Sequence, residues 1–252
     1  MNLEVSPVPG EETLALRELH RHEMHCQMLR DSWHERGWTD SYLLRIGGRV
    51  VGYGLVGGIG LDPRDIVVEF YVLPASRGRA LPLFRRLIEA SGARTIETQS
   101  NDLLLTLMLF DCAQEIRSDV VLFRDAIETD LAAPPGATFR GIDAVDRDRL
   151  VAAGLDADAG WMIEADGSPV AAGGLLFHYN PPYGDIYMET AGSSRRRGYG
   201  SYLVQELKRA CYRMGKIPSA RCDATNDASR ATLQKAGMHP CARKLVGLLK
   251  PD

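Results

Sequence analysis

The alternation of apolar and polar residues along the chain predicts short strands and amphipathic helices. From Asp185 to Thr190 the alternation has period two, so Asp185, Tyr187 and Glu189 are expected on one face of a strand and the even-numbered residues on the other. Farther along, apolar residues recur at helical spacing, at Leu203, Leu207, Ala210, Cys211 and Met214. Gly215 is expected to end this helix, and Gly237 to end another that starts near Ser229.

A further amphipathic helix is expected near the N-terminus, from about Glu11 to Arg36. Its apolar stripe is predicted at Leu16, Leu19, Cys26, Leu29 and Trp33. Its four histidines (20, 22, 25 and 34) are expected on a solvated face. His22 and Cys26 are one helical turn apart, as metal ligands can be, but no third ligand follows at a suitable spacing. We therefore predict no metal site.

The same order of elements occurs twice in the chain. Hairpin glycines Gly48 and Gly167 are 119 positions apart, and Arg77 and Arg195 are 118 apart. Asn101 and Asn226 follow at a separation of 125. Each copy is predicted to contain a strand, a helix, a two-stranded hairpin, a strand, a helix, a strand, a helix and a strand. This order indicates an α+β fold of two units, each a mixed, mostly antiparallel sheet flanked by helices.

A segment rich in proline and glycine, from Thr129 to Gly136, separates the two copies. It predicts domains at residues 1–130 and 131–252.

The second copy contains the turn Arg195-Arg196-Arg197-Gly198-Tyr199-Gly200-Ser201 at the start of its central helix. The first turn of a helix presents unpaired backbone N–H groups at a positive dipole end, which suits a pyrophosphate. In the first copy the two glycines are replaced by Ala80 and Pro82, and proline removes a backbone donor. We expect the first copy to be a degenerate unit that binds no acyl-CoA.

This turn and the later segment Asn226-Asp-Ala-Ser229-Arg-Ala-Thr-Leu233-Gln-Lys-Ala-Gly237-Met238 together resemble the GNAT superfamily of acyl-CoA-dependent N-acyltransferases. The resemblance covers about residues 160 to 250, with Met238 where the family usually has Phe. It implies that the turn cradles the pyrophosphate of acetyl-CoA and that the preceding strand holds the pantetheine. The implied acetyl-CoA-binding residues are Thr190, Arg195, Arg196, Arg197, Gly198, Tyr199, Gly200, Ser201, Asn226 and Ser229.

The resemblance also implies that backbone N–H groups near Thr190 and Ala191 stabilise the oxyanion. Many members of the family carry a tyrosine as general acid where this chain has Leu233, which we expect to be a core residue. Many also carry a glutamate where this chain has Arg221. The remaining catalytic candidates are Glu189, as a base or merely as the partner of an arginine, and Tyr187.

The segment from His178 to Tyr183, with Tyr187, is a candidate for contacts to the acceptor or an ordinary Pro-Pro connection. A ping-pong route through Cys222 is disfavoured, because only Arg221 is at hand to lower its pKa.

Composition narrows the expected function. The net charge of −3 argues against nucleic-acid binding, and the five scattered cysteines argue against disulfides and favour a reducing cytoplasm. No membrane segment or leader is expected.

The predicted function is transfer of an acetyl group from acetyl-CoA directly to a primary amine of a small molecule or a protein, by a monomer or homodimer. The alternatives are a non-catalytic acyl-CoA sensor or scaffold, and an interaction module that has lost ligand binding.

Overall fold

The computed structural model describes residues 2–24, 31–58, 63–178 and 181–250. Contacts between residues divide the chain into two units. Unit 1 comprises Met1–Val120, His178–Asn180 and Ala242–Asp252, and unit 2 comprises Val121–Phe177 and Pro181–Cys241. The chain thus passes from unit 1 to unit 2 before the Pro/Gly-rich segment, and it returns to unit 1 near its C-terminus.

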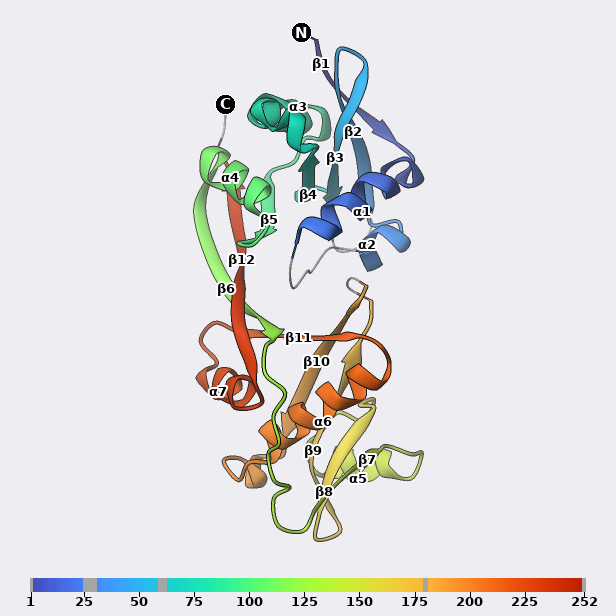
Figure 1. The fold of residues 1–252 in the computed structure, drawn as a ribbon, viewed down its shortest axis with the longest axis vertical. Helices are drawn as coiled ribbons and strands as arrows, with labels where there is room; N and C mark the ends of the chain where they lie inside the picture. Colours follow the sequence, from blue (N-terminus) through green and yellow to red (C-terminus); the bar gives the residue numbers. More distant parts are fainter. Residues whose placement is uncertain (1, 25–30, 59–62, 179–180, 251–252) are drawn as a thin grey trace. The chain divides into compact units, whose positions relative to one another are not determined.

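Unit 1 contains the predicted order of helices and strands, except that two shorter helices stand where one helix from about Glu11 to Arg36 was expected (Figure 1). Its elements are β1 (Leu3–Val8), η1 (Gly10–Thr13), α1 (Leu14–Glu23), α2 (Asp31–Glu35), β2 (Thr39–Ile46), β3 (Arg49–Gly57), β4 (Ile66–Val72), η2 (Pro74–Arg79), α3 (Ala80–Ser91), β5 (Thr95–Gln99), α4 (Leu103–Cys112) and the first part of β6 (Ala113–Asp125). The strand order is β1-β2-β3-β4-β5-β12-β6. Strands β1 to β4 are antiparallel, β4 and β5 are parallel, and β12 is antiparallel to β5.

Unit 2 repeats this order. Its elements are β7 (Ala137–Gly141), α5 (Asp146–Ala152), β8 (Trp161–Ala165), β9 (Ser168–Leu176), β10 (Tyr183–Thr190), η3 (Gly192–Ser194), α6 (Tyr199–Arg213), β11 (Ile217–Asp223), α7 (Asp227–Lys235) and the first part of β12 (Met238–Leu249). The strand order is β6-β11-β10-β9-β8-β7. From β7 to β11, β10 and β11 pair in parallel, and the other neighbouring strands pair antiparallel. The predicted α+β architecture of mixed strands flanked by helices is confirmed, but the strands of both units belong to one 12-stranded sheet and not to two separate sheets.

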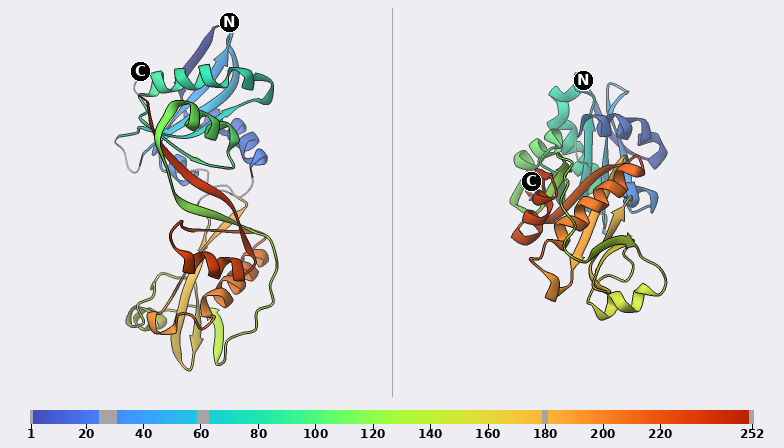
Figure 2. Two further views of the ribbon diagram at one scale, coloured as in Figure 1. Left: turned by 90° about the vertical axis from the view of Figure 1, so that its left-hand side faces the viewer. Right: turned by 60° about the horizontal axis from the view of Figure 1, so that its bottom comes forward.

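Two strands are shared by the units. Strand β6 begins in unit 1 and ends in unit 2, whereas β12 begins in unit 2 and ends in unit 1. The two strands are neighbours in the strand order, and Figure 2 shows them side by side as the green and red strands.

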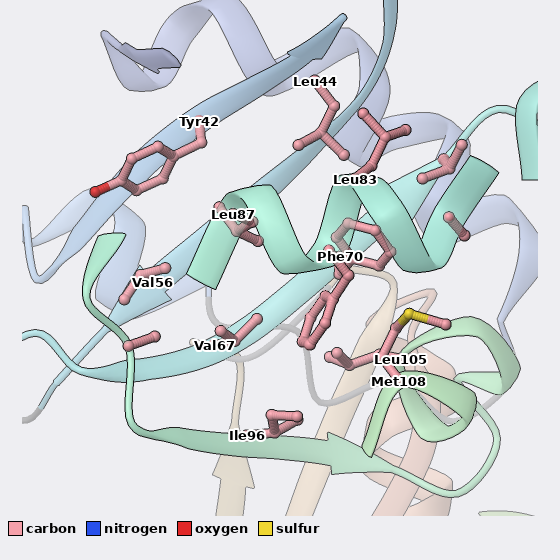
Figure 3. Close-up of a cluster of buried hydrophobic side chains, with 14 of the residues drawn as sticks. Tyr42, Leu44, Val56, Val67, Phe70, Leu83, Leu87, Ile96, Leu105 and Met108 are labelled. Atoms are coloured by element: carbon pink, nitrogen blue, oxygen red, sulfur yellow. The ribbon is translucent and has the colours of Figure 1, made fainter. Parts of the chain in front are cut away.

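The core of unit 1 lies between the sheet and helices α3 and α4 (Figure 3). Phe70 of β4 meets Phe84 of α3 edge to face, with ring centroids 4.9 Å apart. Leu83 and Leu87 extend this layer along α3, and both are fully buried. These side chains follow the helical spacing of apolar residues in α3, so local periodicity accounts for this half of the core.

Helix α1 covers the opposite face of the unit 1 sheet, and there the sequence-based expectation is partly wrong. Leu16 is buried as predicted, but Leu19 is 46% exposed, while Arg17 and His20 are buried. Arg17 pairs through Nε and Nη2 with both oxygens of Glu69, each at 3.0 Å.

His20 contacts two partners in this layer. Its Nδ1 lies 2.9 Å from Tyr53 Oη and its Nε2 lies 3.1 Å from Asp102 Oδ2, so its ring nitrogens are satisfied inside the protein. Burial acts to lower the pKa of His20, but the carboxylates of Asp102, Glu69 and Glu23 together outweigh it, so the net shift of the pKa is upward. Cys26, one helical turn after His22 in the sequence, lies outside the described residues. The His22 side chain is 76% exposed.

In unit 2, α6 packs on β9 and β10 and supplies the centre of the core (Figure 1). Leu203, Leu207 and Cys211 are fully buried as predicted, whereas Met214 is 47% exposed because α6 ends at Arg213. Gly215 follows with φ of +66°, the left-handed conformation expected after a helix. Along the described part of the chain, no helix is long and apolar enough to cross a membrane.

Candidate acyl-CoA site

The first turn of α6 presents backbone rather than side chains. Gly198 is the N-cap residue, with φ of +88°, and Arg196 has φ of +61°. Left-handed backbone costs a non-glycine residue about 1 kcal/mol, and such strain is typical of functional turns. The N–H groups that follow Gly198 belong to the first helical turn, which has no preceding carbonyls to bond. This turn is therefore shaped to receive an anion.

The side chains of the predicted coenzyme residues divide into two groups. Arg195, Arg196 and Arg197 are exposed, and Arg195 Nε donates to Thr190 O over 3.4 Å. Tyr199 is buried in the core, and Ser201 Oγ donates to Gly198 O over 3.1 Å. Both side chains thus stabilise the turn from the protein interior. The arginines are the side chains available to an anion at this turn.

Gly200, in the first turn of α6, faces the end of β10 and helix α7. A Cβ atom built there would lie 2.7 Å from Met188 Cε, 3.2 Å from Thr190 Oγ1 and 3.3 Å from Thr232 Cγ2. A larger side chain would displace these neighbours or fill the space beside the strand end. The glycine thus lets the first turn of α6 pack directly against the end of β10, and this junction of turn and strand end is called the cradle below.

Strands β10 and β11 pair over only part of their length. Their parallel ladder spans Tyr183–Ile186 with Ile217–Ala220, and β10 then continues to Thr190 along β9. The Ala191 N–H donates to Val170 O of β9 over 3.0 Å. Because successive N–H groups of a strand point to opposite sides, the N–H groups of the odd-numbered residues of β10 point to β9. The N–H groups of Met188 and Thr190 therefore point to the β11 side, beyond the end of the parallel ladder.

This geometry corrects one expectation. The Ala191 N–H is bonded to β9 and is not available to an oxyanion, whereas the Met188 N–H, which the sequence reading did not propose, points into the opening between the strands. The Thr190 N–H points the same way. Backbone direction depends on strand pairing, which no local sequence signal specifies.

Asp185 is a further candidate residue, which the sequence analysis placed on β10 without proposing a role for it. Its side chain is 11% exposed, and its Oδ2 lies 3.2 Å from Nε of Arg221 on the neighbouring strand. Burial raises the pKa of Asp185 to about 6, while the positive charge of Arg221 acts in the opposite direction. The alternation of β10 placed Asp185 on the face of Tyr187, but only the register of β10 with β11 brings it to Arg221.

The two catalytic candidates from the sequence lie farther toward the strand end. Glu189 is exposed, and among the described residues it forms no ion pair. Tyr187 is half-buried, with its ring against Gly174 of β9, where a Cβ atom would lie 2.8 Å from the phenol oxygen. Burial, followed by the carboxylates of Asp156, Asp158 and Glu189, raises the pKa of Tyr187. This face of β10 is therefore acidic.

Asn226 is the N-cap of α7, and its Oδ1 accepts the Ser229 N–H over 2.9 Å. In unit 1 the same capping position is held by Asp102, which accepts the Leu105 N–H over 3.1 Å. The counterpart of Asn226 is thus Asp102 rather than the expected Asn101.

Two further predictions concern the core beside the site. Leu233 is 4% exposed and packs in the core as expected. Burial raises the pKa of the Cys222 thiol, which argues against its use as a nucleophile. In the candidate acceptor segment, Tyr179 and Asn180 lie outside the described residues, and Tyr183 is the first residue of β10.

The turn in unit 1 that corresponds to Arg195–Ser201, called the phosphate turn below after its expected ligand, is built differently. Arg77 Nε donates to Val72 O over 3.0 Å, as Arg195 does to Thr190. However, the N-cap Arg79 has φ of −113°, and Pro82 stands in the first turn of α3. The Arg77 guanidinium is also paired with the Glu23 carboxylate. The features that suit an anion in unit 2 are thus replaced or occupied in unit 1.

Comparisons with known proteins agree with this geometry. Residues 126–238 match the model of the Acetyltransferase (GNAT) family. An acetyltransferase of the GNAT family from Colwellia psychrerythraea superposes with a TM-score of 0.75 at 14% identity, over 98% of this chain and 100% of that chain. No curated protein has significant sequence similarity to the chain.

Two further solved structures resemble the whole chain. A tandem GNAT protein from the clavulanic acid biosynthesis pathway, solved without AcCoA, gives a TM-score of 0.65 at 16% identity over 100% of both chains. A GCN5-related N-acetyltransferase from Sphaerobacter thermophilus gives 0.56 at 16% identity, over 99% of this chain and 96% of that chain. Residues 126–238 thus form a domain of the acetyltransferase (GNAT) family, and the whole chain has the fold of a tandem GNAT protein.

Proposed function

We propose that this chain is an N-acetyltransferase that moves an acetyl group from acetyl-CoA to a primary amine of a small molecule or a protein, with its working site in unit 2. The observation that carries the proposal is the cradle at Gly198 and Gly200, where exposed arginines and free helix N–H groups meet the end of β10. Gly198 leaves the backbone of the turn open, and Gly200 lets the turn pack against β10, so the first N–H groups of α6 face outward beside the strand end, which suits the coenzyme pyrophosphate.

The residues present fit an acyl-CoA donor. The first turn of α6 and Arg195 to Arg197 would hold the pyrophosphate. The N–H groups of Met188 and Thr190 point to the β11 side of β10 and would hold the thioester end of the donor, including the oxygen that becomes negative during transfer.

The amine must lose a proton, and we assign this role to Asp185. A buried carboxylate with a pKa of about 6 is ionised at neutral pH yet basic enough to accept a proton, directly or through water. Arg221, 3.2 Å away, keeps it charged. Glu189 is the second candidate, and Tyr187 lines the same face. Leu233 stands where many family members carry a tyrosine as general acid. The coenzyme can leave without such an acid, because a thiol with a pKa of about 8.5 can depart as the thiolate.

Calorimetric titration with acetyl-CoA tests the proposal. We expect binding by the native chain and at least ten-fold weaker binding by Gly200→Val, because its side chain would collide with Met188 and Thr190 and displace the first turn of α6 from β10. Gly78→Val is the matched control, since a Cβ atom at Gly78 in unit 1 meets nothing within 4 Å.

Release of free thiol with a panel of primary amines then tests transfer. Binding without turnover of any amine would favour an acyl-CoA sensor or scaffold. Equal binding by the native chain and Gly200→Val would indicate that the coenzyme does not bind at this turn of unit 2. No binding by the native chain would contradict the proposed function.

A further inference from the structure

The segment that links β6 to β7 lies along helix α6. Residues 127–135, called the strap below, are held by polar side chains of that helix. Lys208, which is 2% exposed, donates from Nζ to Ile127 O over 2.6 Å and to Ala236 O over 2.9 Å. Arg209 Nη2 donates to Thr129 O over 3.2 Å. These bonds fix the start of the strap to the C-terminal half of α6.

Gln205 holds the middle of the strap. Its Oε1 accepts the Leu131 N–H over 2.6 Å, and its Nε2 donates to Leu131 O over 3.1 Å. One side-chain amide therefore satisfies both backbone groups of a single residue, as a neighbouring strand would. Gln205 is only 1% exposed, so losing these bonds would leave a buried amide unpaired.

The strap runs toward the N-terminal end of α6. Lys208 bonds Ile127, and Gln205, which lies nearer the start of the helix, bonds Leu131. Pro134 then lies beside Gly198, with its Cγ 3.9 Å from the position of a Cβ atom there. These helix positions share one face. Ten helical residues span about 15 Å, and seven extended residues reach about 23 Å, so the strap can cover this distance.

At its end the strap reaches the phosphate turn. The Cγ of Pro134 lies 3.9 Å from the position of a Cβ atom at Gly198, whose left-handed conformation shapes the cradle. Ala132, Ala133 and Pro135 beside it are exposed. The last part of the strap, residues 131–135, is thus uncharged and mostly apolar, and it lies next to N–H groups suited to an anion.

We propose that the strap is the outer wall of the coenzyme site, that it contacts the phosphate-adenosine end of acyl-CoA, and that Gln205 is the residue that positions it. This inference rests on the proposed function. The coenzyme and Gln205 hold the strap in the same place, so binding of the coenzyme orders the strap and loss of Gln205 weakens binding. Gln205 acts through the strap and does not touch the reacting atoms.

Hydrogen exchange of the peptide covering residues 127–136, measured with and without acetyl-CoA, tests the proposal together with calorimetry. In the native chain acetyl-CoA slows exchange of this peptide, whereas S-acetylpantetheine, which lacks phosphates and adenosine, does not. In Gln205→Leu the peptide exchanges faster, and acetyl-CoA binds about five- to ten-fold more weakly, because the wall is no longer pre-organised. The turnover number at saturating acetyl-CoA changes little, so the effect falls on KM.

The matched control is Ile163→Ala on β8. Ile163 is fully buried in the core of unit 2 and is not a partner of the strap, so its loss lowers stability without freeing the strap. We expect its affinity for acetyl-CoA to stay close to native.

If the native chain binds acetyl-CoA but exchange of residues 127–136 is unchanged, and Gln205→Leu binds as tightly as native, the strap proposal is wrong and the proposed function stands. An equal loss of affinity in Ile163→Ala would also overturn it, since general destabilisation would then explain the effect. Failure of the native chain to bind acetyl-CoA would overturn both.

Discussion

Replacing Asp185 by asparagine removes the charge and the basicity of the proposed general base while it preserves the size of the side chain. General-base catalysis contributes roughly 10²- to 10⁴-fold, so we expect kcat/KM for the amine to fall at least about 100-fold at pH 7.5. The affinity for acetyl-CoA should not change, because the phosphate turn lies at the other end of β10 from Asp185.

The pH profile gives a sharper test than the rate alone. With a pKa of about 6, Asp185 is ionised above pH 6 and becomes protonated below it. The kcat/KM of the native enzyme should therefore fall about ten-fold for each pH unit below 6. Arg221→Met removes a charge that lowers this pKa, so it should move the acid limb to higher pH. Asp185→Asn should lack this limb.

Thiol release from acetyl-CoA, followed with a chromogenic disulfide between pH 5 and 8.5, measures these profiles. The same amine is used for every variant, so that its own titration contributes equally. Asp148→Asn is the control, because Asp148 is an exposed carboxylate on α5. If Asp185→Asn keeps most of its kcat/KM and the same acid limb, the assignment is refuted. A large loss in Glu189→Gln under the same conditions would then identify Glu189 as the base.

The other expected effects concern stability, measured by urea denaturation of each variant. Gly237→Ala should lower the unfolding free energy by at least about 1 kcal/mol, because φ is +83° and the new Cβ would collide with the Ile127 carbonyl; no change would show that the backbone relaxes freely there. Leu233→Ala should cost about 2–5 kcal/mol, as expected for a side chain 4% exposed in the core, and a cost below 1 kcal/mol would contradict its assignment to the core. Arg17→Met should cost about 3–5 kcal/mol by leaving Glu69 buried without its cation, and Arg17→Met/Glu69→Gln should recover part of the loss; no recovery would refute that reason.

Much of the fold could be predicted because the burial of its elements is periodic and local. The α6 stripe at Leu203 and Leu207 and the hairpin turns at Gly48 and Gly167 follow from spacing alone. The predicted correspondence of Arg77 and Arg195 is also confirmed, because each arginine donates to the carbonyl of the residue five positions earlier. The order of helices and strands was confirmed in both copies for the same reason.

The polar interior could not be predicted, because its partners are distant in sequence. Arg17 and Glu69 are 52 residues apart, and His20 and Asp102 are 82 apart, so the periodicity of α1 placed His20 in solvent although it is buried. The same limit concealed the pairing of Asp185 with Arg221. Buried polar residues look like solvent-facing residues until the sheet brings their partners together.

Strands β6 and β12 each belong partly to one unit and partly to the other, which has a consequence for dividing such a chain into fragments. A fragment ending at residue 130 would lack the segment of β12 that lies beside β5, and a fragment starting at 131 would lack β6. Each would expose open strand edges, which favour aggregation or capture of another strand. The two duplicated halves have become mutually dependent, so we expect separately made fragments to reconstitute the protein when mixed rather than to behave as autonomous domains.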